Sequence, residues 1–171
     1  MPQPKFPKWS KTTYQSCAAL IQSQQSLLLS TLGDSQTPNA SYAPFIQHQG
    51  AFYIFVSGLA EHTQNLLNHS QASLLIIEGE KEAENIFARQ RIQLQVNALL
   101  ISKKEAHWEA RLEAFESKFG ELILTLKALP DFHLFQLSPI SGRYVKGFGQ
   151  AYPLTSNELK TLFSLVNQSV K

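Results

Sequence analysis

The amino-acid sequence predicts one domain of the mainly β class (α+β), an antiparallel barrel with helices at its periphery. Apolar stretches of strand length follow one another at close spacing with turn residues between them, which is typical of antiparallel sheets. Helical stretches are inserted between groups of strands and do not alternate with single strands, which argues against a parallel α/β sheet. The chain of 171 residues is long enough to bury a sizeable core in a single domain.

The N-terminal part begins with a predicted loose arm over residues 1–11, and residues 12–171 are predicted to form the domain. Pro2, Pro4 and Pro7 interrupt the arm, whereas apolar residues recur at helical spacing over residues 12–24. Predicted strands follow at residues 26–32, 39–46 and 51–56. A break at Gln49 and Gly50 separates the last two strands, so they are predicted to form a hairpin.

The middle of the chain contains both kinds of element. Helices are predicted over residues 60–69 and 107–120, and strands over residues 72–77 and 89–101. Residues 78–84 between them are rich in acidic side chains and are predicted to form a solvated loop.

The C-terminal part is predicted to hold a helix over residues 122–129, a strand over residues 132–137 and a turn over residues 138–142. A strand over residues 143–152 follows, interrupted by Gly147 and Gly149. Thr155 and Glu158 have the spacing of a capping box, which predicts that a final amphipathic helix begins there.

Composition sets the expected location of the protein. Cys17 is the single cysteine, which excludes an intrachain disulfide framework and favours a reducing compartment. The longest apolar run is of strand length, far below the roughly 18 residues of a membrane span, and the first residues have no secretory pattern. We therefore predict a cytoplasmic protein without a membrane partner.

Two classes of function are disfavoured by the motifs. The stretch Lys146-Gly147-Phe148-Gly149 matches the start of an RNA-binding octapeptide, but the residues after it depart from that pattern, so no nucleic-acid partner is predicted. The five histidines form no set with metal-ligand spacing, so no metal site built from protein side chains is predicted.

A candidate anion site lies where the strand over residues 51–56 gives way to a helix. Ser57 and Gly58 precede that helix, and free backbone N–H groups at a helix start attract anions. A phosphate or propionate could be held there by polar and basic side chains, namely His62, Thr63, Asn65, Arg89 and Arg91. Ordinary helix capping and surface charge would produce the same pattern. Tyr42, in a strand that contains Pro44, is expected at an edge or facing a ligand.

Four stretches together resemble one known family. They are residues 38–45, 59–66, 87–91 and 145–152, and the last, which includes Lys146, is the most specific. The sequence resembles the heme-utilisation branch (HugZ/HutZ type) of the FMN-binding split-barrel, or pyridoxamine 5'-phosphate oxidase-like, family. The resemblance implies a six-stranded antiparallel Greek-key split barrel of the FMN-binding type, an obligate homodimer, and two cofactor sites between the subunits.

The resemblance also implies roles for individual residues. In the wider family FMN is bound, with its phosphate at positions like Ser57, Thr63, Arg89 and Arg91. In the heme-utilisation branch heme is bound instead, and an aspartate set like Asp131 hydrogen-bonds the iron-ligating histidine across the dimer interface. Asp131 is therefore the expected catalytic residue. The expected cofactor-binding residues are Tyr42, Ser57, His62, Thr63, Asn65, Arg89, Arg91 and Lys146.

The chain departs from the branch at one position. The family's heme-ligating histidine lies in the C-terminal tail, whereas this chain has no histidine after His133. His133, Tyr144 and Tyr152 are the alternative iron ligands. Three functions stay open: a heme-binding protein or heme-degrading enzyme of iron recovery, an FMN-binding oxidoreductase, and a non-enzymatic split-barrel dimer.

The low charge content fits an oligomer. Charged residues make up 16% of the chain, against about 25% in typical soluble proteins. Obligate interfaces are depleted in charge, so alternate positions along residues 89–101 are expected to lie in a dimer interface.

Overall fold

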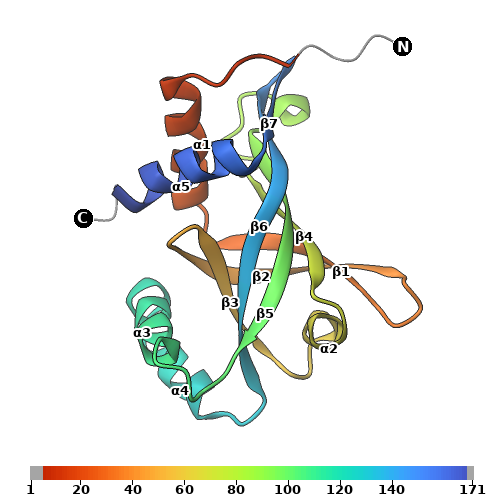
Figure 1. Cartoon of the computed structure of the whole chain (residues 1–171), viewed down its shortest axis with the longest axis vertical. Coiled ribbons are helices and arrows are strands. Elements are labelled where there is room, and N and C mark those ends of the chain that lie inside the picture. The colour runs from red at the N-terminus through yellow and green to blue at the C-terminus, as the bar shows by residue number, and fades with distance from the viewer. Residues whose placement is uncertain (1–5, 169–171) are drawn as a thin grey trace.

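A computed structural model describes residues 6–168 as a β-barrel flanked by helices (Figure 1). The strands are β1 (Ser26–Leu32), β2 (Pro38–His48), β3 (Ala51–Ser57), β4 (Gln71–Ile77), β5 (Arg91–Ile101), β6 (Phe132–Gly147) and β7 (Gln150–Leu154). The helices are α1 (Lys11–Ser23), α2 (Glu61–Asn68), α3 (Trp108–Phe119), α4 (Leu122–Ala128) and α5 (Ser156–Gln168), with a short 3₁₀ turn η1 (Ile86–Ala88).

The barrel closes through a pairing between strands distant in sequence. The sheet order is β3-β2-β1-β4-β5-β6-β7, and β3 also pairs with β6, so β1 to β6 form a closed six-stranded antiparallel barrel. The predicted hairpin around Gln49 and Gly50 joins β2 to β3, and both residues adopt the left-handed φ that such a tight turn requires. The predicted split-barrel fold is thus confirmed.

The predicted turn over residues 138–142 is wrong, because β6 runs through it without a break. Its pairing with β5 shifts register there: Gln95 faces Ser141 and Val96 faces Pro139, which leaves Ile140 as the extra residue of a β-bulge. Ser, Pro and Gly favour turns locally, but the ladder to β5 on both sides of the bulge keeps the segment extended.

The predicted strand over residues 143–152 is a hairpin. Its first half ends β6 at Gly147, its second half is β7, and Gly149 takes the left-handed φ between them. The Lys146 motif therefore forms the tip of this hairpin, at one end of the long β5–β6 ribbon (Figure 1).

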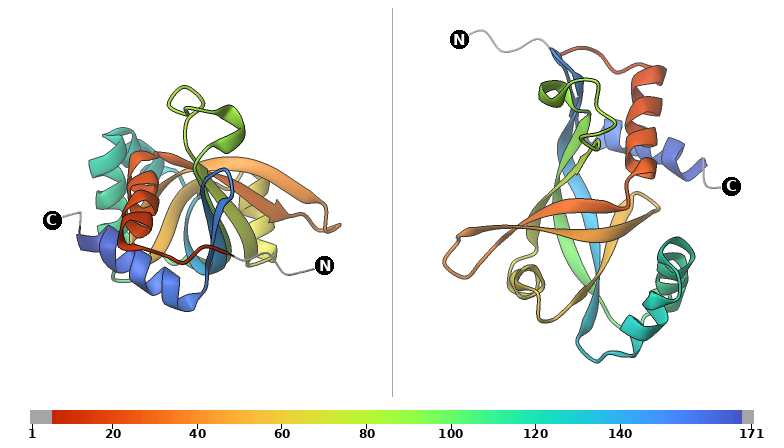
Figure 2. Two further views of the ribbon diagram at one scale, coloured as in Figure 1. Left: turned by 90° about the horizontal axis from the view of Figure 1, so that it is seen from above. Right: turned by 180° about the vertical axis from the view of Figure 1, so that it is seen from behind.

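Two apolar cores lie on opposite sides of β3. All six residues from Ala51 to Val56 are buried, because one face of β3 points into the barrel and the other packs under α3 and α4. The barrel core also receives α1 and α5, and it buries the thiol of Cys17. Figure 2 shows these two helices crossing one end of the barrel.

The predicted arm over residues 1–11 extends too far, since its last residues are anchored to the domain. Trp9 stacks on Tyr14 with ring centroids 4.3 Å apart and donates its indole N–H to the Pro153 carbonyl. Ser10 caps α1 by accepting from the Thr13 N–H, and Lys11 is the first helical residue. Residues 1–5 lie outside the described residues.

At the other terminus the predicted capping box is confirmed. The Thr155 hydroxyl and the Thr155 N–H both donate to the Glu158 carboxylate, and these hydrogen bonds, the hydroxyl's first, lower the pKa of Glu158. Among residues 6–168, no helix has the length and apolarity needed to cross a membrane.

Candidate functional site

The start of α2 gathers several of the predicted residues. β3 ends at Ser57, and after Gly58 the chain turns into α2. The Thr63 side chain is fully buried and donates its hydroxyl to the Ser57 carbonyl at 2.6 Å. Asn65 is also buried and donates its amide to Thr31 Oγ1 at 2.9 Å. Both side chains therefore connect α2 to the barrel and do not line an open anion site.

A second set of contacts joins Ser57 to the segment before β6. The Ser57 hydroxyl donates to Asp131 Oδ2 at 2.7 Å, and the Gly58 N–H donates to the Asp131 carbonyl at 2.6 Å. A Cβ at Gly58 would lie 3.4 Å from His133 Nε2 and 3.5 Å from Asp131 Cβ. We call Ser57, Gly58, Asp131 and His133 the Ser57–Asp131 cluster; it places a carboxylate and an imidazole side by side against a residue without a side chain.

His62 lies between α2 and β2. Its Nδ1 is 3.0 Å from Ser41 Oγ, whereas its Nε2 is buried and has no hydrogen-bond partner among the described residues. Burial lowers the pKa of His62, so its imidazole is neutral at pH 7. A neutral imidazole with an unpartnered nitrogen is chemically able to act as a ligand or an acceptor.

Tyr42 faces away from this region. Side chains alternate along β2, so Ser41 points toward α2 and Tyr42 points out of the barrel, where it is 65% exposed. Tyr42 lies beside Leu28 of β1, which in turn pairs with Leu75 of β4. Together these side chains form an apolar strip on the outside of the sheet.

The predicted basic residues form a separate group at the opposite end of β6, which we call the basic cluster: Arg89, Arg91 and Lys146. Arg89 donates to the Glu78 carbonyl at 2.8 Å, and Arg91 donates to the Arg89 carbonyl at 3.1 Å. Arg91 pairs with Val145, the neighbour of Lys146, whereas Ser57 pairs with Phe132.

The two groups lie far apart within one chain. Thirteen residues of β6 separate the position beside Ser57 from the position beside Arg91. At about 3.3 Å per residue, about 40 Å of strand lies between them. Figure 1 shows α2 and the β6–β7 hairpin at different ends of the barrel. Within one chain, Ser57 and the two arginines cannot hold a single phosphate.

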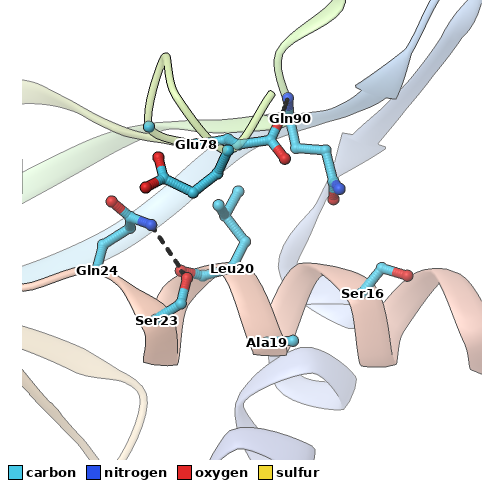
Figure 3. Close-up of a pocket in the computed structure, with 9 residues that line it drawn as sticks. Ser16, Ala19, Leu20, Ser23, Gln24, Glu78 and Gln90 are labelled. Carbon is cyan, nitrogen blue, oxygen red and sulfur yellow. Dashed lines mark hydrogen bonds between the residues drawn. The ribbon is translucent and has the colours of Figure 1, made fainter. Parts of the chain in front are cut away.

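Two grooves are lined by Glu78 and Gln90, and Lys146 of the basic cluster lines the second of them. One, of about 580 Å³, separates α1 from the segment around Glu78 and Gln90 (Figure 3). The other, of about 420 Å³, runs from Glu78 to Lys146 and Phe148. In both grooves the Glu78 carboxylate accepts from the Gln90 N–H at 3.0 Å. This hydrogen bond ties the segment after β4 to the segment before β5.

Two of the three alternative iron ligands, Tyr144 and Tyr152, lie inside the protein. Tyr144 and Tyr152 are buried in the stack that includes Trp9, and Tyr144 donates its hydroxyl to Gln90. Burial raises the pKa of Tyr144, so it does not ionise readily. His133, only partly buried, remains available. Sequence reasoning missed Ser41 and noted Gly58 only as a residue before the helix, because their roles depend on contacts with distant segments.

Comparison with known proteins adds a family and named relatives. The family model described as pyridoxamine 5'-phosphate oxidase matches residues 14–146. The chain is 38% identical over 138 residues to a protein of Vibrio cholerae named heme oxygenase HutZ, covering 81% of this chain and 78% of that protein.

Solved structures agree with these matches. The crystal structure of HutZ, described as a heme storage protein of Vibrio cholerae, is similar with a TM-score of 0.73 and 33% identity, covering 78% of this chain and 93% of that chain. The structure of Campylobacter jejuni ChuZ has a TM-score of 0.81 and 31% identity, covering 89% of this chain. This chain spans 63% of ChuZ, so ChuZ has regions without a counterpart here.

Proposed function

The chain belongs to the pyridoxamine 5'-phosphate oxidase family, and from this premise we propose that it binds heme between two copies of itself and serves heme utilisation. The observation that carries the proposal is the Ser57–Asp131 cluster, in which Asp131 and His133 lie together against Gly58. The similarity to HutZ supports the proposal, since that protein is called a heme oxygenase and also a heme storage protein. Heme binding is common to both names.

The residues present fit a heme group. Its iron needs an axial ligand, and His133 offers an imidazole for which the described residues show no hydrogen bond. Its porphyrin needs an apolar surface, which the exposed strip of Tyr42 and Leu28 supplies. Its propionates need cations, which the basic cluster supplies. We propose His133 as the iron ligand.

A homodimer is part of this proposal, because the two groups lie far apart in one chain. On β1, β2, β4 and β5, the outward side chains of the described strands include one charged residue, Arg91. An uncharged face with an apolar strip is the composition of an obligate interface. Two copies packed through it would bring the Ser57–Asp131 cluster of one toward the basic cluster of the other.

The proposed site assigns each residue a definite task. Ser57 donates to one oxygen of Asp131 and leaves the other oxygen free to accept from an imidazole N–H. Such a hydrogen bond would orient His133 or a histidine of the second copy and increase its basicity. Bound heme would supply the redox chemistry of oxidative cleavage, and the protein would contribute orientation and electrostatics. We also propose that the protein cleaves heme enzymatically and that it is located in the cytoplasm.

Hemin titration tests the proposal. We expect a saturable Soret band with the wild-type protein, a shifted band with weaker binding in His133→Ala, and an altered band in Asp131→Asn. His107→Ala, on the exposed start of α3, is the matched control and should leave the spectrum unchanged. Unchanged spectra in both His133→Ala and Asp131→Asn would place the heme elsewhere, and a protein that does not bind hemin would overturn the function.

FMN is the second candidate ligand, favoured by the family model over residues 14–146. Its phosphate would need the basic cluster, since Thr63 and Asn65 already bond within the chain. A saturable flavin spectrum without hemin binding would establish FMN in place of heme. Binding of neither would leave the non-enzymatic dimer.

A further inference from the structure

Lys118, in the last turn of α3, is a cation without an acidic partner in the described part of the chain. Its Nζ donates to the carbonyls of Phe45 at 2.9 Å and Gln24 at 3.2 Å. The same Nζ lies 4.4 Å from the ring centroid of Phe45. Partial burial lowers the pKa of Lys118, although the residue as a whole is exposed. An ammonium group has three N–H donors, so one remains after these two bonds.

A groove of about 640 Å³ opens beside Lys118. Its lining residues come from α1, β2, α3 and α5. The helices α1, α3 and α5 lie on the side of the barrel away from α2 (Figures 1 and 2). Its walls are mostly apolar side chains, namely Ile21, Phe45, Ile46, Ala114 and Val166. The polar residues of the lining are Gln22, Gln47, Ser117 and Lys118.

The end of β2 adds further donors to this groove. The Phe45 N–H donates to the Gln25 carbonyl at 3.1 Å, so the Phe45 backbone points away from β3. Backbone direction alternates along a strand, so the Gln47 N–H points the same way, toward an edge that no strand covers. The side-chain nitrogen of Gln47 is also buried without a hydrogen-bond partner among residues 6–168.

We propose that this groove binds a monocarboxylate with an apolar body, such as a medium-chain fatty acid. The carboxylate would accept from Lys118 and from the exposed β2 edge at Gln47, and the hydrocarbon would lie against Ile21, Ile46 and Val166. The carboxylate has two acceptor oxygens and a negative charge, which match the unpaired donors and the uncompensated cation. The proposal does not rest on heme or FMN binding.

Isothermal titration calorimetry of the full chain with sodium octanoate is the test, with octanamide as the neutral ligand of the same length. We expect one octanoate to bind per chain, and octanamide to bind at least roughly tenfold more weakly, since hydrogen bonds to charged groups are worth that factor. Absence of saturable octanoate binding, or equal affinity for the two ligands, would overturn the proposal.

A pair of variants at Ser117 locates the site without disturbing the Lys118 contacts. Ser117 is exposed on α3, so both Ser117→Glu and Ser117→Gln should keep the wild-type circular dichroism and thermal midpoint. The added carboxylate of Ser117→Glu should repel the carboxylate of the ligand, so octanoate should bind to it at least roughly tenfold more weakly than to the neutral Ser117→Gln. Lys118→Met should also lose binding. Octanoate binding that is equal in the two Ser117 variants would disprove this location.

Discussion

Thr63 and Asn65 illustrate how far residue type alone can predict a site. Both stand in α2, where hydroxyl and amide groups predict either anion ligands or helix contacts. In the structure Thr63 is 0% exposed and Asn65 is 6% exposed, and each has a partner on the barrel. The same polar atoms suit both roles, so burial decides, and it depends on β1 and β3 packing against α2.

Thr63→Val tests this structural role. The substitution keeps the shape of the side chain but removes the donor to the Ser57 carbonyl, which is then left without this hydrogen bond. We expect the free energy of unfolding to fall by about 1–3 kcal/mol in urea denaturation, with hemin affinity unchanged. Thr125→Val, exposed on α4, is the control and should stay within about 0.5 kcal/mol of wild type. Loss of cofactor binding without loss of stability would instead make Thr63 a ligand.

His62 links stability to pH. Burial lowers its pKa in the folded protein below the value of about 6.5 in an unfolded chain. Below that pH the unfolded chain binds more protons, so the free energy of unfolding should fall as the pH drops through and below about 6.5. His48, whose pKa is lowered mainly by burial and then by Arg111, acts in the same direction.

Denaturation at about pH 7.5 and about pH 5 measures this dependence. His62→Gln removes one titrating group, so its loss of stability between the two pH values should be smaller than that of wild type. His69→Gln, at the end of the same helix, is the matched control. An acid dependence that is identical in wild type and His62→Gln would contradict the prediction.

At the scale of elements, β6 shows tertiary pairing overriding local turn preference. Ser138, Pro139 and Gly142 suit a turn, yet β5 pairs with β6 on both sides of the bulge. Gly142 is required by this close approach: a Cβ there would lie 2.2 Å from the Gln93 carbonyl oxygen and 2.5 Å from Leu94 Cδ2. Sequence reasoning identified the glycine but not the neighbouring strand that demands it.

Gly142→Ala and Gly147→Ala form a matched pair on β6. The Gly142 substitution should lower the free energy of unfolding by about 1–3 kcal/mol or more, because β5 must move to admit the methyl group. At Gly147 a Cβ meets nothing within 4 Å, so that substitution should be neutral or slightly stabilising. Chemical denaturation compares the two, and equal effects would show that the close approach is not the cause.

At the scale of the whole molecule, the dimer is the main untested prediction. Leu28 is 47% exposed at the centre of the apolar strip, between Tyr42 and Leu75. We expect sedimentation velocity at micromolar concentration to give twice the 19.2 kDa of one chain. Leu28→Arg should give the monomer, because a buried unpaired charge disfavours the interface.

Leu124→Arg controls for a general effect of an added charge. Leu124 is 51% exposed on α4, away from the strip, so this variant should remain dimeric. A wild-type monomer would contradict the interface model, and with it the expectation that the two clusters meet between copies.

The sequence by itself determined most of the elements, the hairpin at Gln49 and Gly50, the capping box at Thr155 and the family. Each of these features depends on residues that are close along the chain or on short sequence motifs. The tertiary structure alone decided the barrel closure of β3 on β6, the continuity of β6 and the separation of the predicted ligands into two groups. The Ser57–Asp131 hydrogen bond joins residues 74 positions apart, and long-range contacts of this kind leave no local pattern in a single sequence.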